Sequence, residues 1–263
     1  MLVRQIYADN NLRNFHYLIA CEETREAMVI DPLDVDRCLD AAKKDGFKIT
    51  TILNTHDHWD HIGGNAEMKE KTGAEIFCHA GASKKIPDVD KGLVAGDIIQ
   101  IGRQVKLNVM DTPGHTESHI CLLSNEKTPS FFCGDTMFNA GVGHCKLGGN
   151  PDKLFKTFDE QINKLSDETK IYPGHDYMIN NLQFTLDREP DNEDAKSFLK
   201  KLEKQSPHDA YVSTMKDERK INSFLRLSSA SIINELKKSF PELGDNPNSK
   251  DVFLALRELR NHW

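Results

Sequence analysis

Short runs of apolar and β-branched residues, separated by glycine, proline and aspartate, recur through the first two thirds of the chain. Such runs are typical of β-strands. The sequence predicts strands at 15–21, 26–32, 49–56, 74–80, 104–113, 119–124, 130–136 and 170–175. Apolar residues at helical spacing predict helices between them, at about 34–45, 63–72 and 151–165. This mixture predicts an α/β fold.

The helix predicted at 151–165 has the clearest boundary. Asn150 can cap it, and Pro151 suits its first turn. Its apolar positions fall on one face, namely Leu154, Phe155, Phe158, Ile162 and Leu165. We expect this face to pack on the sheet.

The pattern changes near residue 179, where strand-like runs cease. Two helices broken near Pro190 are predicted next, with Asp191 capping the second. Further helices are predicted at 229–239 and 250–261, the last capped by Ser249. We therefore expect an α/β domain over residues 1–178 and a C-terminal α-helical domain over residues 179–263.

Composition excludes several classes of protein. The 263 residues carry a formal net charge of −7, which argues against a general nucleic-acid binder. No apolar run approaches the roughly 18 residues that a membrane span needs. The first residues lack the apolar core of a signal peptide, and the six cysteines form no C-x-x-C pair. We expect a cytoplasmic protein with reduced thiols.

Residues that can bind metals follow four of the predicted strands. "NTHDHWDHIGGN" begins where one strand ends, and three further strands end at "DTPGH", "FFCGD" and "IYPGH". Loops at strand ends are where a rigid sheet presents chemistry, so these groups can converge. The candidate ligands are His56, His58, Asp60, His61, His115, Asp135 and His175.

Seven ligands exceed the needs of one tetrahedral zinc ion. They suit two divalent metals, one held by His56, His58 and His115 and the other by Asp60, His61 and His175, with Asp135 as the bridge. Imidazole and carboxylate ligands fit zinc, which we prefer, and also iron or manganese. A lone histidine after a strand is more often structural, and we interpret His79 and His119 in that way, although His119 could instead orient a ligand. The H-x-H-x-D-H run has no comparable structural explanation.

The motifs resemble those of the metallo-β-lactamase superfamily and, within it, the glyoxalase II (hydroxyacylglutathione hydrolase) family. The resemblance is carried by "NTHDHWDHIGGN", "DTPGHTESHI", "FFCGDTMFNAGVG", "IYPGHDYMINNLQF", "REPDN" and "ALRELRNHW". It implies a four-layer αβ/βα sandwich with a dinuclear site at one edge, followed by a C-terminal helical domain. It also implies that Arg257 and Arg260 bind glutathione carboxylates and that Tyr177 contacts glutathione.

One loop departs from the family pattern. "GVGHCKLGGN" has His144 where the family has a basic residue, and it lacks the aromatic pair that usually follows. Lys146 can supply the positive charge. We include His144 and Lys146 among the substrate-binding candidates and expect Cys145 to be an inert loop thiol.

A dinuclear site of this kind can activate water as a hydroxide bridging the metals and hydrolyse an acyl bond. Asp60 and Asp135 would orient the hydroxide, and Asp60 could accept its proton. We predict hydrolysis of S-(2-hydroxyacyl)glutathione, for example S-D-lactoylglutathione, to glutathione and a hydroxy acid. The alternatives are a persulfide dioxygenase with one iron, a hydrolase of another thioester, an RNA-processing nuclease, which the charge opposes, and a binding module without catalysis. The sequence leaves the oligomeric state open.

Overall fold

The computed structural model describes residues 1–263 and contains two main sheets that face each other. The first has the order β1-β2-β3-β4-β5-β6 and the second β13-β10-β9-β8-β7. The first consists of β1 (Leu2–Tyr7), β2 (Phe15–Ala20), β3 (Glu26–Ile30), β4 (Lys48–Leu53), β5 (Glu75–His79) and β6 (Lys91–Leu93). The second consists of β7 (Ile98–Ile101), β8 (Val105–Asp111), β9 (Ile120–Ser124), β10 (Ser130–Gly134) and β13 (Lys170–Pro173). A hairpin of β11 (Met137–Phe138) and β12 (Gly141–Val142) follows β10.

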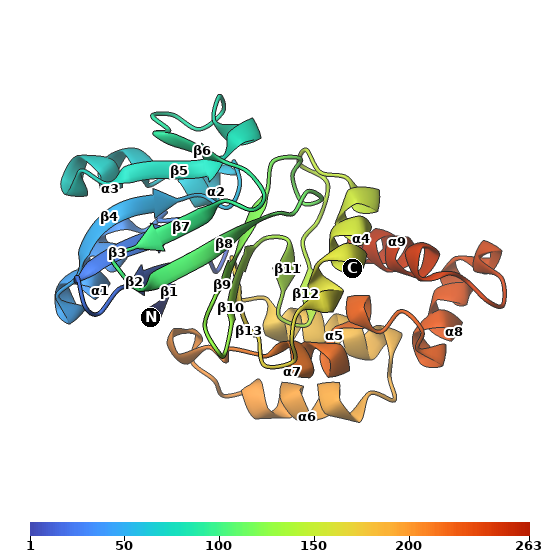
Figure 1. The fold of residues 1–263 in the computed structure, drawn as a ribbon. Coiled ribbons are helices and arrows are strands. Elements are labelled where there is room, and N and C mark those ends of the chain that lie inside the picture. The colour runs from blue at the N-terminus through green and yellow to red at the C-terminus, as the bar shows by residue number, and fades with distance from the viewer.

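Helices cover the outer face of each sheet (Figure 1). On the first sheet, α1 (Val35–Asp45) and α3 (Asn65–Thr72) bury Cys38 and Met68 against the strands. On the second, α4 (Pro151–Glu160) buries Leu154 and Phe158. Apolar side chains such as Tyr17 and Leu107 fill the space between the sheets. These layers confirm the α/β class and the four-layer αβ/βα sandwich.

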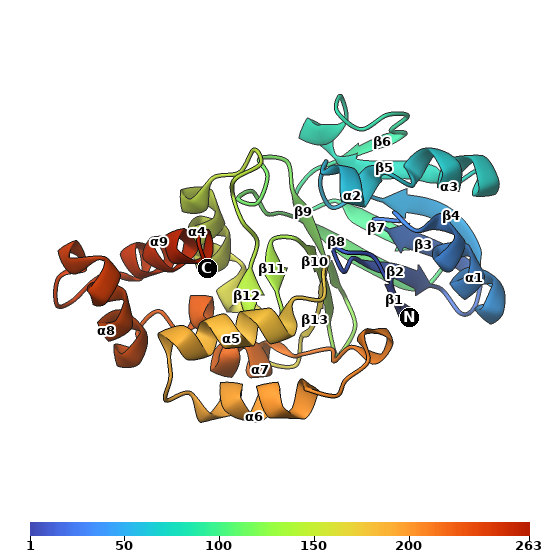
Figure 2. The same ribbon diagram turned by 180° about the vertical axis from the view of Figure 1, so that it is seen from behind.

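The C-terminal part is helical and packs along the second sheet and α4 (Figure 2). It contains α5 (Met178–Arg188), α6 (Glu193–Leu202), α7 (Met215–Ile221), α8 (Ala230–Ser239) and α9 (Ser249–Arg260). Figures 1 and 2 both show α9 beside α4, where Phe253 packs on Phe155 and Phe158. No helix is long and apolar enough to cross a membrane.

Several predicted boundaries need correction. The cap of α6 is Asn192, not Asp191, and the cap of α9 is Asn248, not Ser249. In both cases the asparagine side chain accepts a hydrogen bond from the backbone N–H three residues on, which the residue expected in its place does not do. The helix expected at 63–72 is α3 and begins at Asn65, and a separate short helix, α2 (Trp59–Ile62), precedes it. The cap at Asn150 is confirmed, but α4 ends at Glu160 and a short 3-10 turn continues it.

Candidate metal centre and adjoining pocket

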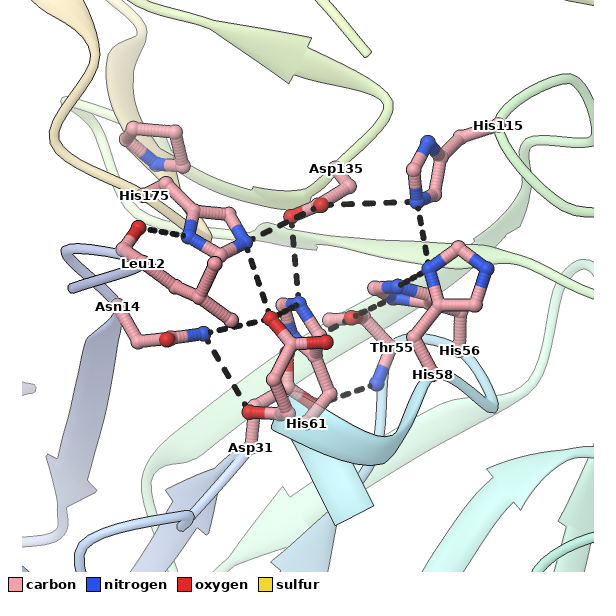
Figure 3. Close-up of polar contacts among 12 residues, drawn as sticks. Leu12, Asn14, Asp31, Thr55, His56, His58, His61, His115, Asp135 and His175 are labelled. Atoms are coloured by element: carbon pink, nitrogen blue, oxygen red, sulfur yellow. Dashed lines mark hydrogen bonds and ion pairs between the residues drawn. The ribbon is translucent and has the colours of Figure 1, made fainter. Parts of the chain in front are cut away.

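The strand ends bring all seven predicted ligands to one place. His56 and His58 lie in the loop after β4, α2 carries Asp60 and His61, and the other three follow β8, β10 and β13. Their ligand atoms form three compact groups, each spanning at most 4.8 Å: His56, His58 and His115; Asp60, His61 and His175; and His56, His61 and Asp135. Figure 3 shows the three imidazoles of the first group facing one another, with Asp135 between His115 and His175. The first two groups coincide with the two sets proposed from the sequence.

The segment that carries the ligands after β4 is held in place because the chain behind it packs very closely on the residues that follow β3. A Cβ on Gly64 would lie 1.8 Å from the carbonyl oxygen of Pro32. The φ of Gly64 is −92°, an ordinary helical value. Gly64 is therefore needed for close backbone approach and not for an unusual φ.

Hydrogen bonds on the outer nitrogen of three imidazoles fix their tautomers. His115 Nδ1 lies 2.7 Å from the carbonyl oxygen of His144, His175 Nδ1 2.8 Å from that of Leu12, and His58 Nε2 3.0 Å from that of Leu147. A carbonyl oxygen can only accept, so each of these nitrogens carries its proton. The other nitrogen of each neutral ring therefore turns a lone pair towards the centre.

Asp31, which the sequence analysis did not single out, fixes the remaining two rings. Its Oδ2 accepts hydrogen bonds from His61 Nδ1 at 2.9 Å and from the Thr55 hydroxyl at 2.7 Å. Since the Thr55 hydroxyl hydrogen points to Asp31, its oxygen must accept from His56 Nδ1, 3.0 Å away. The inward nitrogen of His56 is therefore a lone pair as well. His61 holds a proton on Nδ1, so its inward Nε2 is a lone pair in the neutral ring that a metal would bind.

These lone pairs make the site suitable for cations. His58 Nδ1 lies 3.0 Å from both His56 Nε2 and His115 Nε2, although none of the three can donate. His61 Nε2 and Asp135 Oδ1 are buried without any hydrogen-bond partner. Buried polar atoms normally have partners, and nitrogen and oxygen donors without thiolate fit a borderline or hard divalent metal. The residues present thus fit a dinuclear metal site.

Asp60 and Asp135 supply the negative charge of the site. Asp135 Oδ2 is 3.3 Å from His175 Nε2 and 3.5 Å from His115 Nε2, so this carboxylate faces both groups. Burial raises its pKa, but His175 and His61 lower it, and the result is well below its usual range. Burial raises the pKa of Asp60, but His61, whose Nε2 lies 3.4 Å from Asp60 Oδ2, and a hydrogen bond accepted from Asn14 at 3.0 Å outweigh burial and lower this pKa. Both carboxylates are ionised at neutral pH.

Neighbouring residues behave largely as expected. Asp57 turns away to pair with Lys85 at 2.7 Å, and Trp59 is 67% exposed. His119 is buried behind the site, where its Nε2 accepts a hydrogen bond from the backbone N–H of Asp135 at 3.2 Å. It thus holds the Asp135 backbone and is not one of the converging ligand groups.

A pocket of about 190 Å³ adjoins the metal centre, and two of its lining residues lie against ligands. The ring of His144 lies 4.9 Å from that of His115, and Tyr177 stacks on His175 at 4.9 Å. The structure brings all five predicted substrate-binding residues into this pocket. Its lining consists of Phe138, Val142, His144, Lys146, Tyr177, Asn181, Arg257, Arg260 and Asn261.

Arg257 is buried in the wall of this pocket. It is 4% exposed, and its Nη1 donates to the carbonyl oxygens of Val142 at 3.3 Å and Gly143 at 3.1 Å. Burial lowers its pKa to about 10, so it remains a cation at neutral pH. Arg260 and Lys146 are more accessible, and their bonds go to neutral partners, Asn181 Oδ1 and the carbonyl of Asn261. Three cations without a carboxylate partner therefore line the pocket.

The pocket also contains an aromatic surface that was not found from the sequence. Phe138 lies with its ring 5.2 Å from that of Tyr177 and 5.8 Å from that of His175. Sequence reasoning missed it because the family's aromatic pair was sought after His144 and not before it. Its only signal was an apolar residue three positions after Asp135.

Comparisons with known proteins agree with this geometry. The model of the metallo-beta-lactamase superfamily matches residues 16–175, and that of the hydroxyacylglutathione hydrolase C-terminus matches residues 176–263. The hydroxyacylglutathione hydrolase of Nitrosococcus oceani is 51% identical over 263 residues, which are 100% of both chains. The chain belongs to the hydroxyacylglutathione hydrolase family. As a member of that family it is a hydrolase, and its His and Asp groups form a dinuclear metal site.

Two solved structures of other proteins are similar in fold to this chain. ETHE1 from Myxococcus xanthus is 26% identical, with a TM-score of 0.67 over 99% of this chain and 98% of that one. TTHA1623, solved in a di-iron-bound form, is 27% identical, with a TM-score of 0.55 over 65% of this chain and 91% of that one. ETHE1 shares the fold over nearly the whole of this chain, and TTHA1623 shares it over about two thirds.

Proposed function

We propose that this member of the hydroxyacylglutathione hydrolase family cleaves S-(2-hydroxyacyl)glutathione thioesters, such as S-D-lactoylglutathione, to glutathione and the hydroxy acid. The observation that carries this proposal is the pocket with three cations and two aromatic rings that adjoins the metal centre, where His144 lies beside His115 and Tyr177 stacks on His175. Glutathione has two carboxylates, which guanidinium and ammonium groups bind through charge-assisted hydrogen bonds. A glutathione thioester bound in this pocket would have its carbonyl beside the metal centre.

The proposed metals are two divalent ions per chain, with zinc preferred over iron and manganese. His56, His58 and His115 would hold one, Asp60, His61 and His175 the other, and Asp135 both. Bound there, they supply a water of lowered pKa and polarise the thioester carbonyl.

The chain's own residues divide the remaining work. Arg260 and Lys146, at the open side of the pocket, bind the glutathione carboxylates, while Arg257 adds positive charge from within. The rings of Tyr177 and Phe138, beside His175, would lie on either side of the sulfur end of the bound glutathione. Asp60, whose Oδ2 is held by Asn14, accepts the proton of the attacking water, and Asp135 orients that water.

The two proposed roles, catalysis and substrate binding, fall in successive parts of the chain. We propose that residues 1–178 form the catalytic domain and residues 179–263 the substrate-binding domain, because all seven ligands precede residue 179 and both arginines follow it. We also propose a cytoplasmic location, which all six cysteines, free of disulfides, support.

The test is turnover of S-D-lactoylglutathione by the purified protein, with metal content measured on the same sample. We expect release of glutathione and about two metals per chain. Two metals without turnover would exclude this substrate. One iron with oxygen consumption on glutathione persulfide would instead favour the persulfide dioxygenase suggested as an alternative.

Arg260→Ala tests the binding mode. Arg260 makes a single hydrogen bond within the protein, to Asn181, and otherwise lies over the rings of Phe184 and Trp263. Its loss should therefore raise KM about tenfold and leave kcat nearly unchanged. The matched control is Lys156→Ala, which removes an exposed cation on α4 outside the pocket. Equal effects of the two substitutions would contradict direct binding by Arg260.

A further inference from the structure

The β11–β12 hairpin connects the metal centre to the substrate pocket. It begins two residues after Asp135 and ends two residues before His144. Its residues Phe138 and Val142 line the pocket. The position of this hairpin therefore sets the shape of the pocket wall beside the metals.

The hairpin has little stability of its own. Each strand has two residues, and Ala140 at the turn has a φ of +57°, an uncommon conformation for a residue with a side chain. A two-residue pairing needs support from outside. That support comes from side chains of the C-terminal helices.

Glu218 of α7 lies at the centre of this support. It is fully buried, and its Oε2 accepts hydrogen bonds from the backbone N–H of Ala140 at 2.8 Å and from Asn222 Nδ2 at 3.1 Å. Its Oε1 accepts from the Ser213 hydroxyl at 2.6 Å. No cation is among these partners.

Two of the partners extend this contact to the residues on either side of Ala140. Asn222 Nδ2 also donates to the carbonyl oxygen of Gly141 at 3.1 Å, and Asn139 Nδ2 donates to Ser213 Oγ at 2.8 Å. One carboxylate thus holds three consecutive hairpin residues, one directly and two through Asn222 and Ser213.

The arrangement requires an ionised carboxylate. Three donors converge on its two oxygens, and a carboxylate is purely an acceptor, whereas a carboxylic acid places a hydrogen where one of those donors points. Burial raises the pKa of Glu218 to about 7, while the hydrogen bonds from Ser213 and Ala140 oppose this rise. The carboxyl therefore changes charge within the physiological range.

Other titratable groups near Glu218 do not compensate its charge. Cys133 of β10 and Tyr211 before α7 face it, and both have pKa values above their usual range, so they are neutral at pH 7. Asp217, its neighbour on α7, is engaged with Thr214 at the start of the helix.

We propose that Glu218 is a positioning residue that holds the substrate-facing hairpin through its ionised carboxylate, so that affinity for the thioester falls when this carboxylate is neutralised. This inference rests on the proposed function for its kinetic readout. It concerns the fit of the substrate and leaves the metal ligands untouched. KM should therefore respond and kcat should not.

The experiment compares the full-length, metal-loaded protein with Glu218→Gln, which mimics the neutral acid. KM and kcat for S-D-lactoylglutathione are measured from pH 6 to pH 8.5. For the unsubstituted protein we expect KM to rise about tenfold as pH falls through about 7, because one charge-assisted hydrogen bond is lost. In E218Q, KM should already be raised about tenfold at pH 8 and should not vary with pH, with kcat and metal content unchanged.

The control is Glu189→Gln. Glu189 is another buried carboxylate of the helical part, but its partners Asn192, Arg226 and Ser229 do not touch the hairpin. E189Q should lose stability yet keep the KM and its pH profile. If E218Q keeps the original KM profile, or if E189Q alters it in the same way, the inference is wrong.

Hydrogen exchange separates this inference from the proposed function. A peptide covering residues 137–143 should exchange faster in E218Q than in the unsubstituted protein or in E189Q, whatever the substrate. Unchanged exchange there would overturn the role of Glu218. Absence of thioester turnover in the unsubstituted protein would instead overturn the proposed function alone.

Discussion

At the scale of single residues, the metal centre depends on a carboxylate behind the ligands. Asp31 accepts from His61 directly and orients His56 through Thr55. It also accepts the backbone N–H of Thr55 at 2.8 Å, which fixes the start of the ligand loop. Asp31→Asn should therefore reduce metal affinity 10- to 100-fold. The NH2 group of the asparagine can only donate, and it would face groups that themselves donate to Asp31. Competition with a chelator of known affinity measures this change.

Asp34→Ala is the matched control for that prediction. Asp34 lies three residues further along the same segment, and it caps α1 without touching the site. Its loss should cost about 1 kcal/mol of stability and leave metal affinity unchanged. If both substitutions weaken metal binding equally, the effect comes from general loosening of the segment and not from Asp31.

Asp31 also shows what the sequence could reveal at this scale. The H-x-H-x-D-H run stands out because its spacing has no structural explanation, and the strand-end positions of the other three residues supported it. Asp31 in "VIDP" resembles any turn residue after a strand. Its role comes from contacts with residues 24 and 30 positions away, which only the pairing of β3 with β4 brings together.

At the scale of elements, long apolar runs were predictable and polar or edge elements were not. The sequence analysis missed β1, β6, β7, the β11–β12 hairpin, α2 and α7. β1 is an edge strand whose residues are mostly only partly buried, and β6 has three residues. α7 is mostly charged, and it is defined by the reciprocal capping of Thr214 and Asp217 and not by an apolar face. Tertiary contacts decide whether short edge strands form, whereas the apolar face of α4 was visible in the sequence.

Glu189 connects three of the C-terminal helices, and its contribution should depend on pH. It ends α5, and it accepts hydrogen bonds from Asn192 at the start of α6 and from Arg226 and Ser229 before α8. Although burial raises its pKa, these hydrogen bonds lower it below the usual 4.5. The folded state thus favours the ionised form, so the stabilisation is present above pH 4.5 and is lost as pH falls through the lower folded-state pKa.

Glu189→Gln should therefore destabilise the protein by about 2 kcal/mol at pH 7. The difference from the unsubstituted protein should shrink as pH falls below 4.5, because the carboxyl group takes up a proton in the unfolded chain before it does so in the folded protein. Denaturant unfolding at pH 7, 5 and 3.5 measures both free energies. A constant difference down to pH 3.5 would show that the charge of Glu189 contributes nothing.

At the scale of the whole molecule, the boundary seen in the sequence does not divide the hydrophobic core. The two family models meet between residues 175 and 176, and the change in apolar pattern near residue 179 lies close to that point. The largest buried cluster nevertheless combines Phe131 and Phe158 of the α/β part with Phe224 and Phe253 of the helical part. A sequence pattern shows where element types change, but it does not show which faces are buried against each other.

This shared core predicts that the full chain unfolds in one cooperative transition. Separating the parts would expose the α4–α9 interface, including the Phe253 ring that packs 5.5 Å from both Phe155 and Phe158. Burying such aromatic surface stabilises by several kcal/mol, comparable to the net stability of a domain. Hydrogen exchange at increasing denaturant should therefore give coincident midpoints for peptides from β4–β5 and from α5–α6. Two separate midpoints would mean that each part folds alone and that Glu218 acts across a hinge, not within a single core.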